Sequence, residues 1–307
     1  MARRRKKGRD ITGVIIIDKP TGHSSNYILQ KVKRLFNAKK AGHTGSLDPL
    51  ATGVLPICLG EATKLSAYLL DSDKRYHVTC HMGVSTDSGD ADGKQLNTHP
   101  IPDFTESDLQ HVLTQFIGEQ HQVPPMYSAL KHQGQPLYKL ARKGIEVTRK
   151  ARTVTIYDIQ LLTMTKESFT LDVRCSKGTY IRTLVEDISH ALGSGGHVTM
   201  LRRVEAANYT LQDAISLDAL QENSEDGDGL DSKLSAAENA LSDWPEVILD
   251  DEMVQSLRYG QTVNPPPIVG TGLIKVFDEQ HVFIGLAELL QDGTLAPKRI
   301  FVLPDND

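Results

Sequence analysis

One carboxylate in this sequence lies in a restrained segment, AGHTGSLDPLATG, at residues 41–53. The acid, Asp48, stands between a leucine and a proline, and the segment contains three glycines. An Asp-Pro pair commonly initiates a turn, so one interpretation is purely structural. A rigid, partly dry loop also suits a nucleophile or an acid–base group, because small errors in attack geometry can cost about two orders of magnitude in rate.

Two other kinds of site fit this segment poorly. A metal site needs several ligands, and only His43 lies near Asp48, with no second acid before Glu61. A phosphate-binding loop would end in Gly-Lys followed by Ser or Thr, and the acid here would repel phosphate. We therefore expect no metal site, and the residues alone leave Asp48 as either a turn former or a reagent.

A carboxylate in dry surroundings needs a cation to stay ionised at neutral pH. The segment SKGTYIRT (176–183) offers one, because Arg182 can form a bidentate pair with Asp48. Tyr180 beside it supplies a ring face and a phenol, and Tyr76 begins an expected strand after the charged run DSDKR. Taken alone, the local sequence also fits a structural interpretation, with a surface arginine and with tyrosines at the ends of a helix and a strand.

The segments that must position these residues alternate between expected strands and helices. Apolar runs and two-residue alternation predict strands at residues 13–20, 76–84, 153–162 and 169–175. Apolar residues at helical spacing predict three helices, with the faces Ile28–Val32–Leu35, Leu109–Val112–Leu113–Phe116 and Ile181–Leu184–Val185–Ile188. Ser24 or Ser25 is expected to cap the first helix, and Thr105 with Asp108 to form a capping box on the second. Together these patterns predict an α+β protein.

Charge is unevenly distributed along the chain, although the net charge is only -5. Residues 1–43 carry 12 Lys and Arg against two acids, and residues 131–152 carry seven against one. Residues 204–252 carry 14 acids against one lysine. Basic arms around an acidic segment favour a polyanionic partner such as nucleic acid, and a solvated surface with chance clustering is the alternative.

Composition sets the remaining expectations. At 39% apolar and 24% charged residues the chain is typical of globular proteins, and no apolar run approaches the ~18 residues that span a bilayer. Three cysteines without a CxxC pair indicate reduced thiols and a cytoplasmic protein. Residues 122–144 read as an excursion from the core, the acidic run at 222–233 as a mobile segment, and the tail from Trp244 as a small β-rich module.

Several segments, taken together and in order, resemble the TruB family of tRNA pseudouridine-55 synthases. They are GVIIIDKPTGHSSN, GHTGSLDPLATGVLPICLGEATK, DKRYHV, STDSGDADG, PPMYSALKHQGQPLYKLARKGIEV, SKGTYIRTL and GGHVTMLRR. The resemblance implies the pseudouridine synthase fold, a mixed, mainly antiparallel sheet flanked by helices. It divides the chain into a catalytic domain at 1–245, with an RNA-clamping thumb at about 122–150, and a PUA-like module at 246–307 that contains LRYGQTV.

The resemblance also implies roles for single residues. Its site set is the catalytic residues Asp48 (as nucleophile), Tyr76 and Arg182, with His43, Tyr76, Tyr180, Leu201, Lys64 and Asp90 in substrate binding. Tyr76 matches a tyrosine that stacks on the target base and takes part in proton transfer, and His43 matches a histidine that enters the T loop. The roles of Lys64 and Asp90 are less definite. Ser46 stands beside the acid where the family commonly has alanine.

The implied reaction is the isomerisation of uridine 55 in the T arm of tRNA. It adds no atom and removes no electron, so we expect neither a cofactor nor a metal, and nothing demands more than a monomer. Attack of the carboxylate at C1′ or at C6, and abstraction of the 2′ proton to give a glycal, all stay open. An RNA-binding protein or RNA chaperone without catalysis is the alternative, and it explains the charge pattern equally well.

Overall fold

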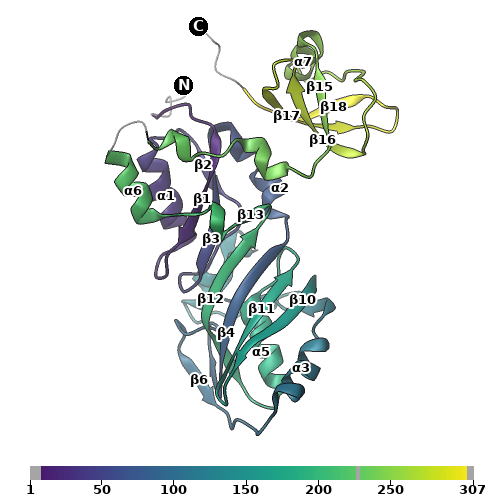
Figure 1. Cartoon of the computed structure of the whole chain (residues 1–307). Helices are drawn as coiled ribbons and strands as arrows, with labels where there is room; N and C mark the ends of the chain where they lie inside the picture. Colours follow the sequence, from purple (N-terminus) through teal and green to yellow (C-terminus); the bar gives the residue numbers. More distant parts are fainter. Residues whose placement is uncertain (1–7, 226–228, 303–307) are drawn as a thin grey trace.

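The computed structural model describes residues 8–225 and 229–302 (Figure 1). Its main sheet has ten strands: β1 Gly13–Lys19, β2 Ala41–His43, β3 Thr52–Leu59, β4 Lys74–Met82, β7 Gly118–Gln122, β10 Arg152–Met164, β11 Ser168–Cys175, β12 Gly196–Ala206, β13 Tyr209–Thr210 and β14 Ile215–Ser216. The strand order is β14-β1-β3-β12-β4-β11-β10-β7, with β2 beside β3 and β13 beside β12. Only the β1–β14 and β3–β12 pairs of this sheet are parallel.

Six helices accompany this sheet: α1 Ser25–Leu35, α2 Ser66–Leu70, α3 Glu106–Thr114, α4 Leu137–Ala141, α5 Ile181–Ala191 and α6 Leu217–Glu225. Two short hairpins stand apart from it, β5 Val84–Thr86 with β6 Gln95–Thr98, and β8 Lys131–His132 with β9 Gln135–Pro136. In Figure 1, α1 and α6 lie together near β1, whereas α3 and α5 lie at the other end of the sheet. The expected mixed, mainly antiparallel sheet with flanking helices is confirmed.

The two halves of the sheet are covered differently, and the hydrophobic pattern of each strand reflects whether one or both of its faces are buried. In β1, Ile15 and Ile17 face the core that includes α1, whereas Val14 and Ile16 face a second buried cluster on the opposite side. A strand buried on both faces reads as a continuous apolar run. In β4, the buried apolar residues are Val78, Cys80 and Met82, and the residues between them are only partly buried because the other face is open, so this part of the strand alternates.

The predicted helix starts are also confirmed. The Ser24 hydroxyl accepts a hydrogen bond from the Tyr27 N–H at the start of α1. Thr105 and Asp108 form a reciprocal capping box on α3. A side-chain cap satisfies one of the N–H groups that an α-helix leaves free, and it commonly stabilises by about 1 kcal/mol. These caps fix where the chain enters each helix and therefore which residues precede it.

A separate four-stranded sheet forms the C-terminal part. Its strands, in the order β15-β16-β17-β18, are β15 Glu246–Leu249, β16 Gly272–Asp278, β17 Phe283–Leu289 and β18 Leu295–Ile300, with helix α7 at Asp251–Arg258. Figure 1 shows this group at the end of the molecule away from α3. It has a buried cluster of its own, but Phe283, Leu286 and Phe301 pack into the cluster beneath β1 and β3. The module is thus docked on the main sheet.

Two segments test the expectations about irregular structure. After β7 ends at Gln122, the excursion at 122–144 contains only the β8–β9 hairpin and α4, as expected for a segment without a clean period. The acidic run at 222–233, expected to be mobile, is partly regular: its first residues end α6, and Asp231–Lys233 form a 3₁₀ turn. Leu220, just before the run, and Leu230, within it, are both buried in the core. Residues 226–228 lie outside the described residues. None of the helices described here is long and apolar enough to cross a lipid bilayer.

Candidate active site

A cavity of about 490 Å³ lies between the loop that precedes β3, the strands β4 and β12, and the start of α5. Its lining includes His43, Asp48, Lys74, Tyr76, Tyr180, Arg182, Leu201 and Arg203. Because β12 pairs with both neighbours, Arg203 lies opposite Gly53 on one side and opposite Tyr76 on the other. The cavity shares Asp48 and Arg182 with a larger hollow of about 860 Å³ that continues beneath the excursion at 122–144.

The loop that carries Asp48 is held by two partners that lie earlier in the chain. The buried Ser25 hydroxyl donates to the Leu47 carbonyl at 3.0 Å and accepts from the Leu47 N–H at 2.7 Å. On the other side of the acid, the fully buried Lys19 ammonium donates to the carbonyls of Pro49 at 3.3 Å and Ala51 at 2.6 Å. The loop is therefore fixed on both sides of its carboxylate.

Lys19 itself is an unusual buried cation. Its third hydrogen bond goes to the Pro20 carbonyl at 2.9 Å. Burial lowers the pKa of Lys19 to about 8, and the Asp48 carboxylate opposes that fall. Near neutral pH the side chain is consequently still protonated, and it stabilises the charge of Asp48 as well as the shape of the loop.

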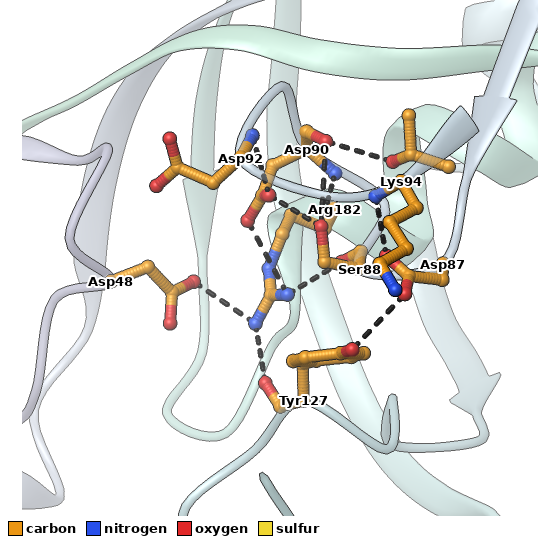
Figure 2. A network of polar contacts seen from close by, with 9 residues as sticks. Asp48, Asp87, Ser88, Asp90, Asp92, Lys94, Tyr127 and Arg182 are labelled. Carbon is orange, nitrogen blue, oxygen red and sulfur yellow. Dashed lines mark hydrogen bonds and ion pairs between the residues drawn. The ribbon is translucent and has the colours of Figure 1, made fainter. Parts of the chain in front are cut away.

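Arg182 lies in the first turn of α5 and faces Asp48, as Figure 2 shows. Its Nη2 is 3.0 Å from Asp48 Oδ2 and donates to the Tyr127 carbonyl at 2.7 Å. Its Nη1 donates to the Ser88 carbonyl at 2.5 Å and is 3.5 Å from Asp90 Oδ2. The guanidinium is thus surrounded by two carboxylates and two carbonyls, and only 5% of the side chain is exposed.

Asp90 belongs to the acidic loop that follows β5. Its Oδ1 accepts from the Ser88 hydroxyl at 2.5 Å and from the Asp92 N–H at 3.2 Å, so its position is fixed within the loop. Burial raises the pKa of Asp48, Arg182 and Lys19 oppose this rise, and Asp90 and Asp92 add to it. The ionised state of Asp48 therefore depends on its two cations.

Aromatic and apolar groups form the rest of the cavity wall. Burial raises the pKa of Tyr76, and the adjacent Arg203 guanidinium opposes that rise. Burial raises the pKa of Tyr180 as well, and the Tyr180 backbone is held by the Gln122 amide, which accepts from its N–H at 2.9 Å and donates to its carbonyl at 3.3 Å. Leu201 supplies a buried apolar surface.

His43, at the end of β2, is kept neutral. Burial lowers its pKa, and the positive charge of Arg203 lowers it further. Its buried Nδ1 has no hydrogen-bond partner among the described residues. A neutral imidazole with a free ring nitrogen in a cavity wall can stack on a planar ligand and still form one hydrogen bond with it.

Seven of the expected site residues are brought together, and one is not. Asp48, Arg182 and Asp90 form one network, and His43, Tyr76, Tyr180 and Leu201 line the smaller cavity. Lys64 lies elsewhere: its Nζ donates to the Ile300 carbonyl at 2.6 Å and pairs with Glu61. It ends a 3₁₀ turn, Gly60–Lys64, its side chain is directed toward the C-terminal part, and it lines neither cavity, so its expected part in substrate binding stays a prediction.

Three buried cations of the site, Lys19, Lys74 and Arg203, were not expected from the sequence. Lys74 lines the cavity and donates to the Leu70 carbonyl at 2.7 Å, and burial lowers its pKa to about 8. Arg203 is 1% exposed and donates to the carbonyls of Val54 at 2.8 Å and Gly45 at 3.2 Å. Lys19 ends an apolar strand next to a proline. A charged residue at the end of a buried apolar run is a signal that could have drawn attention to Lys19. The place of Arg203 in the site, in contrast, follows only from the pairing register of β12.

The arrangement favours one kind of chemistry. A single carboxylate faces an aromatic and apolar cavity and is paired with an arginine, which suits a nucleophile or base acting on a planar substrate. In the part of the chain that the structure describes, no group of three or more His, Cys, Asp or Glu side chains is placed to hold a metal ion.

Comparison with known proteins defines the class. Residues 33–181 match the N-terminal domain of the TruB family of pseudouridylate synthases. Residues 182–242 match the tRNA pseudouridylate synthase B C-terminal domain, and residues 245–301 match the C-terminal domain of pseudouridine synthase II TruB. The chain belongs to the TruB family.

Individual relatives are similar over nearly their full length. The chain is 49% identical to the tRNA pseudouridine synthase B of Shewanella sp. strain ANA-3, covering 98% of each, and 50% identical to that of Nitrosococcus oceani, covering 97% of each. Among solved structures, a Cbf5-Nop10-Gar1 complex contains a chain with a TM-score of 0.73 and 26% identity, covering 95% of this chain and 84% of that one. An H/ACA ribonucleoprotein bound to a substrate RNA contains a chain with a TM-score of 0.74 and 24% identity, covering 99% of this chain and 92% of that one, which shows the shared fold.

Proposed function

We propose that this chain is the tRNA pseudouridine synthase that isomerises uridine 55 in the T arm, with Asp48 as the reagent. The observation that carries the proposal is the pairing of Asp48 with Arg182 at 3.0 Å in the wall of an aromatic-lined cavity. Membership of the TruB family and near-full-length relatives named tRNA pseudouridine synthase B support the substrate.

The reaction exchanges one glycosidic bond for another. The N1–C1′ bond of uridine breaks, the base turns, a C5–C1′ bond forms, C5 loses its proton and N1 gains one. Atoms and electrons balance within the substrate and the solvent, so neither a redox cofactor nor a nucleotide is required. Attack by Asp48 at C1′, its attack at C6 and its removal of the 2′ proton are each compatible with a fixed, ionised carboxylate.

Arg182 and Lys19 keep Asp48 in its reactive state. A half-buried carboxylate tends to become protonated, and an adjacent cation favours the charged form. Arg182 also fixes the direction of the carboxylate, because it contacts Asp48 Oδ2 while its other donors are taken up by Ser88 and Tyr127. Fixed geometry before binding lowers the barrier of the step that follows.

The cavity suits an extruded uracil. Its volume of about 490 Å³ lies within the ~300–1,000 Å³ common for small-molecule sites. Extruding a base costs a few kcal/mol, and stacking on an aromatic side chain returns ~1–3 kcal/mol per base. Tyr76 and His43 offer such surfaces, Tyr180 and Leu201 complete the pocket, and the phenol of Tyr76 is a candidate relay for the C5 proton, giving up its own proton as it accepts that one. Asp90 acts on the substrate through Arg182.

The rest of the chain is assigned to RNA binding. We assign residues 1–245 to the catalytic domain, with the thumb at about 122–150, and residues 246–307 to a PUA-like RNA-binding module. The basic stretch at 131–152 borders the hollow of about 860 Å³ and would position the T arm through its phosphates. One chain contains every residue of the site, so we propose that it acts as a monomer, without a metal, in the cytoplasm where tRNA is processed.

The proposal is tested by mapping the product in an unmodified tRNA transcript. After incubation with the protein, carbodiimide treatment and primer extension should give one new stop, at the position that reports pseudouridine 55. A transcript in which uridine 55 is replaced by cytidine is the control and should give none. Tight binding of the transcript without a new stop would instead support a non-catalytic RNA-binding protein or RNA chaperone.

A further inference from the structure

The guanidinium of Arg182 is held from two sides by segments that are about 40 residues apart in sequence. From the acidic loop, the Ser88 carbonyl accepts from Nη1, and from the start of the thumb, the Tyr127 carbonyl accepts from Nη2 (Figure 2). The direction of the guanidinium toward Asp48 therefore depends on where these two carbonyls lie relative to each other.

One side-chain hydrogen bond joins the same two segments. The Tyr127 hydroxyl donates to Asp87 Oδ2 at 3.0 Å, and Asp87 Oδ1 accepts from the Lys94 N–H at 2.9 Å. Figure 2 shows the phenol reaching from the thumb to Asp87, just before Ser88 in the loop. Burial and the bond to Asp87 raise the pKa of Tyr127, so the phenol keeps its proton and donates.

These contacts close a ring. It runs from Asp87 to the Ser88 carbonyl, through Arg182 to the Tyr127 carbonyl, and back through the Tyr127 side chain to Asp87. Without the phenol–carboxylate bond, the hydrogen bonds described here link the two segments only through Arg182 itself. The guanidinium could then follow either segment, and its contact with Asp48 would loosen.

We propose that Tyr127 and Asp87 are positioning residues that fix Arg182 against Asp48 and couple the thumb to the reaction centre. This inference rests on the proposed function. RNA that seats against the thumb then acts on the carboxylate through two successive contacts, from Tyr127 to Arg182 and from Arg182 to Asp48. Neither Tyr127 nor Asp87 has to touch the reacting atoms.

The test is a double-mutant cycle on the full-length chain. Tyr127→Phe, Asp87→Ala and the double variant are compared in single-turnover tritium release from tRNA labelled at uridine C5, with tRNA affinity measured by filter binding. Each single change should lower the single-turnover rate about tenfold, as expected for a lost hydrogen bond to a charged group. The double variant should be no slower than the slower single variant, and the affinity should change less than threefold.

A pH profile distinguishes positioning from a merely structural role. The charged groups that face Asp48 are Arg182, Lys19, Asp90 and Asp92. The acid limb is the part of the pH profile in which the single-turnover rate falls as Asp48 becomes protonated. With Arg182 less firmly placed, this acid limb should move to higher pH in Tyr127→Phe. The matched control is Tyr157→Phe, which removes a similar bond of 3.1 Å to Asp73 on the open sheet and should leave rate and limb unchanged.

Several outcomes overturn the inference. A Tyr127→Phe protein with the rate and the pH profile of the wild type would do so. A double variant whose rate falls by the product of the two single losses would also do so, as would variants that lose tRNA affinity but keep the single-turnover rate. Should Asp87→Ala fail to fold, Asp87→Asn serves in its place: it keeps an acceptor for the phenol and should retain more activity than Tyr127→Phe. An inactive wild-type protein would refute the proposed function instead, so the two failures are distinguishable.

Discussion

Replacing Arg182 by glutamine tests how the site keeps Asp48 ionised. The change removes a cation that lies 3.0 Å from the carboxylate, while burial and the charges of Asp90 and Asp92 remain. All three of these influences raise the pKa of Asp48. Because the ionised form is the reactive one in every route considered, the acid limb of the single-turnover rate should move to higher pH.

The size of the effect follows from Coulomb's law. Two unit charges about 4 Å apart interact by about 4 kcal/mol at an effective dielectric constant of about 20. The Asp48 side chain is 39% exposed, and screening by solvent reduces this to about 2–3 kcal/mol. On the acid limb, Arg182→Gln should therefore react about 30- to 150-fold more slowly than the wild type. The deficit should shrink as the pH rises and Asp48 ionises in both proteins.

The assay is tritium release under single-turnover conditions between pH 5 and pH 9, with enzyme in excess over tRNA. Arg202→Gln is a matched control, because Arg202 forms a bidentate pair with Asp18 at 3.1 and 2.7 Å beside the site. Its acid limb should stay in place. A uniform loss in Arg182→Gln at every pH, with an unmoved limb, would refute the electrostatic argument and leave Arg182 only a geometric role.

Three further changes have expected outcomes of different kinds. Asp90→Asn removes a like charge near Asp48, so the acid limb should move to lower pH, while looser placement of Arg182 lowers the plateau rate about tenfold. Glu61→Gln should lower the free energy of unfolding at pH 7 by about 2 kcal/mol, measured by urea denaturation. Burial alone would raise the pKa of Glu61, but bonds from Lys40, Lys64 and the Val302 N–H lower it to about 2, so the difference from the wild type should shrink as the pH falls below 4.5. Lys19→Met leaves the Pro49 and Ala51 carbonyls without their donor; it should cost about 2 kcal/mol of stability and slow single-turnover release, with tRNA affinity retained.

Each of these expectations can fail in a distinct way. An acid limb that moves upward in Asp90→Asn would mean that its contact with Arg182 outweighs its charge. A stability difference for Glu61→Gln that persists undiminished at pH 4 and below would contradict the lowered pKa. Glu288→Gln is the matched control, since Glu288 pairs with Lys298 on the surface, and it should change stability by less than about 0.5 kcal/mol. Wild-type rates in Lys19→Met would show that the loop keeps its shape without the lysine.

Much of the fold was predictable because its elements leave periodic signals. The strand β1 reads as a continuous apolar run, since both of its faces are buried, and β4 alternates, since only one is. The pairing of Asp48 with Arg182 was also predictable, because a carboxylate in dry surroundings needs a cation. The resemblance then selected one function from several that the residues allowed.

Other features depend on contacts that leave no periodic pattern. The composition of the Asp48 loop suggests stiffness, but its rigidity comes from Ser25 and Lys19, which lie more than 20 residues earlier. Arg203 enters the site because the register of β12 sets it opposite Tyr76. Lys64 lies close to a site motif in sequence, yet its turn directs it to Ile300. Such contacts require the assembled structure.

The most direct test of the central claim is tritium release from tRNA labelled at uridine C5, by the wild type and by Asp48→Asn, with a parallel gel shift. The substitution keeps the shape of the side chain and removes its charge. We expect release by the wild type and none by the variant, with tRNA binding retained. Equal release by both proteins would contradict the account, because the restrained loop would then hold a carboxylate that takes no part in the reaction.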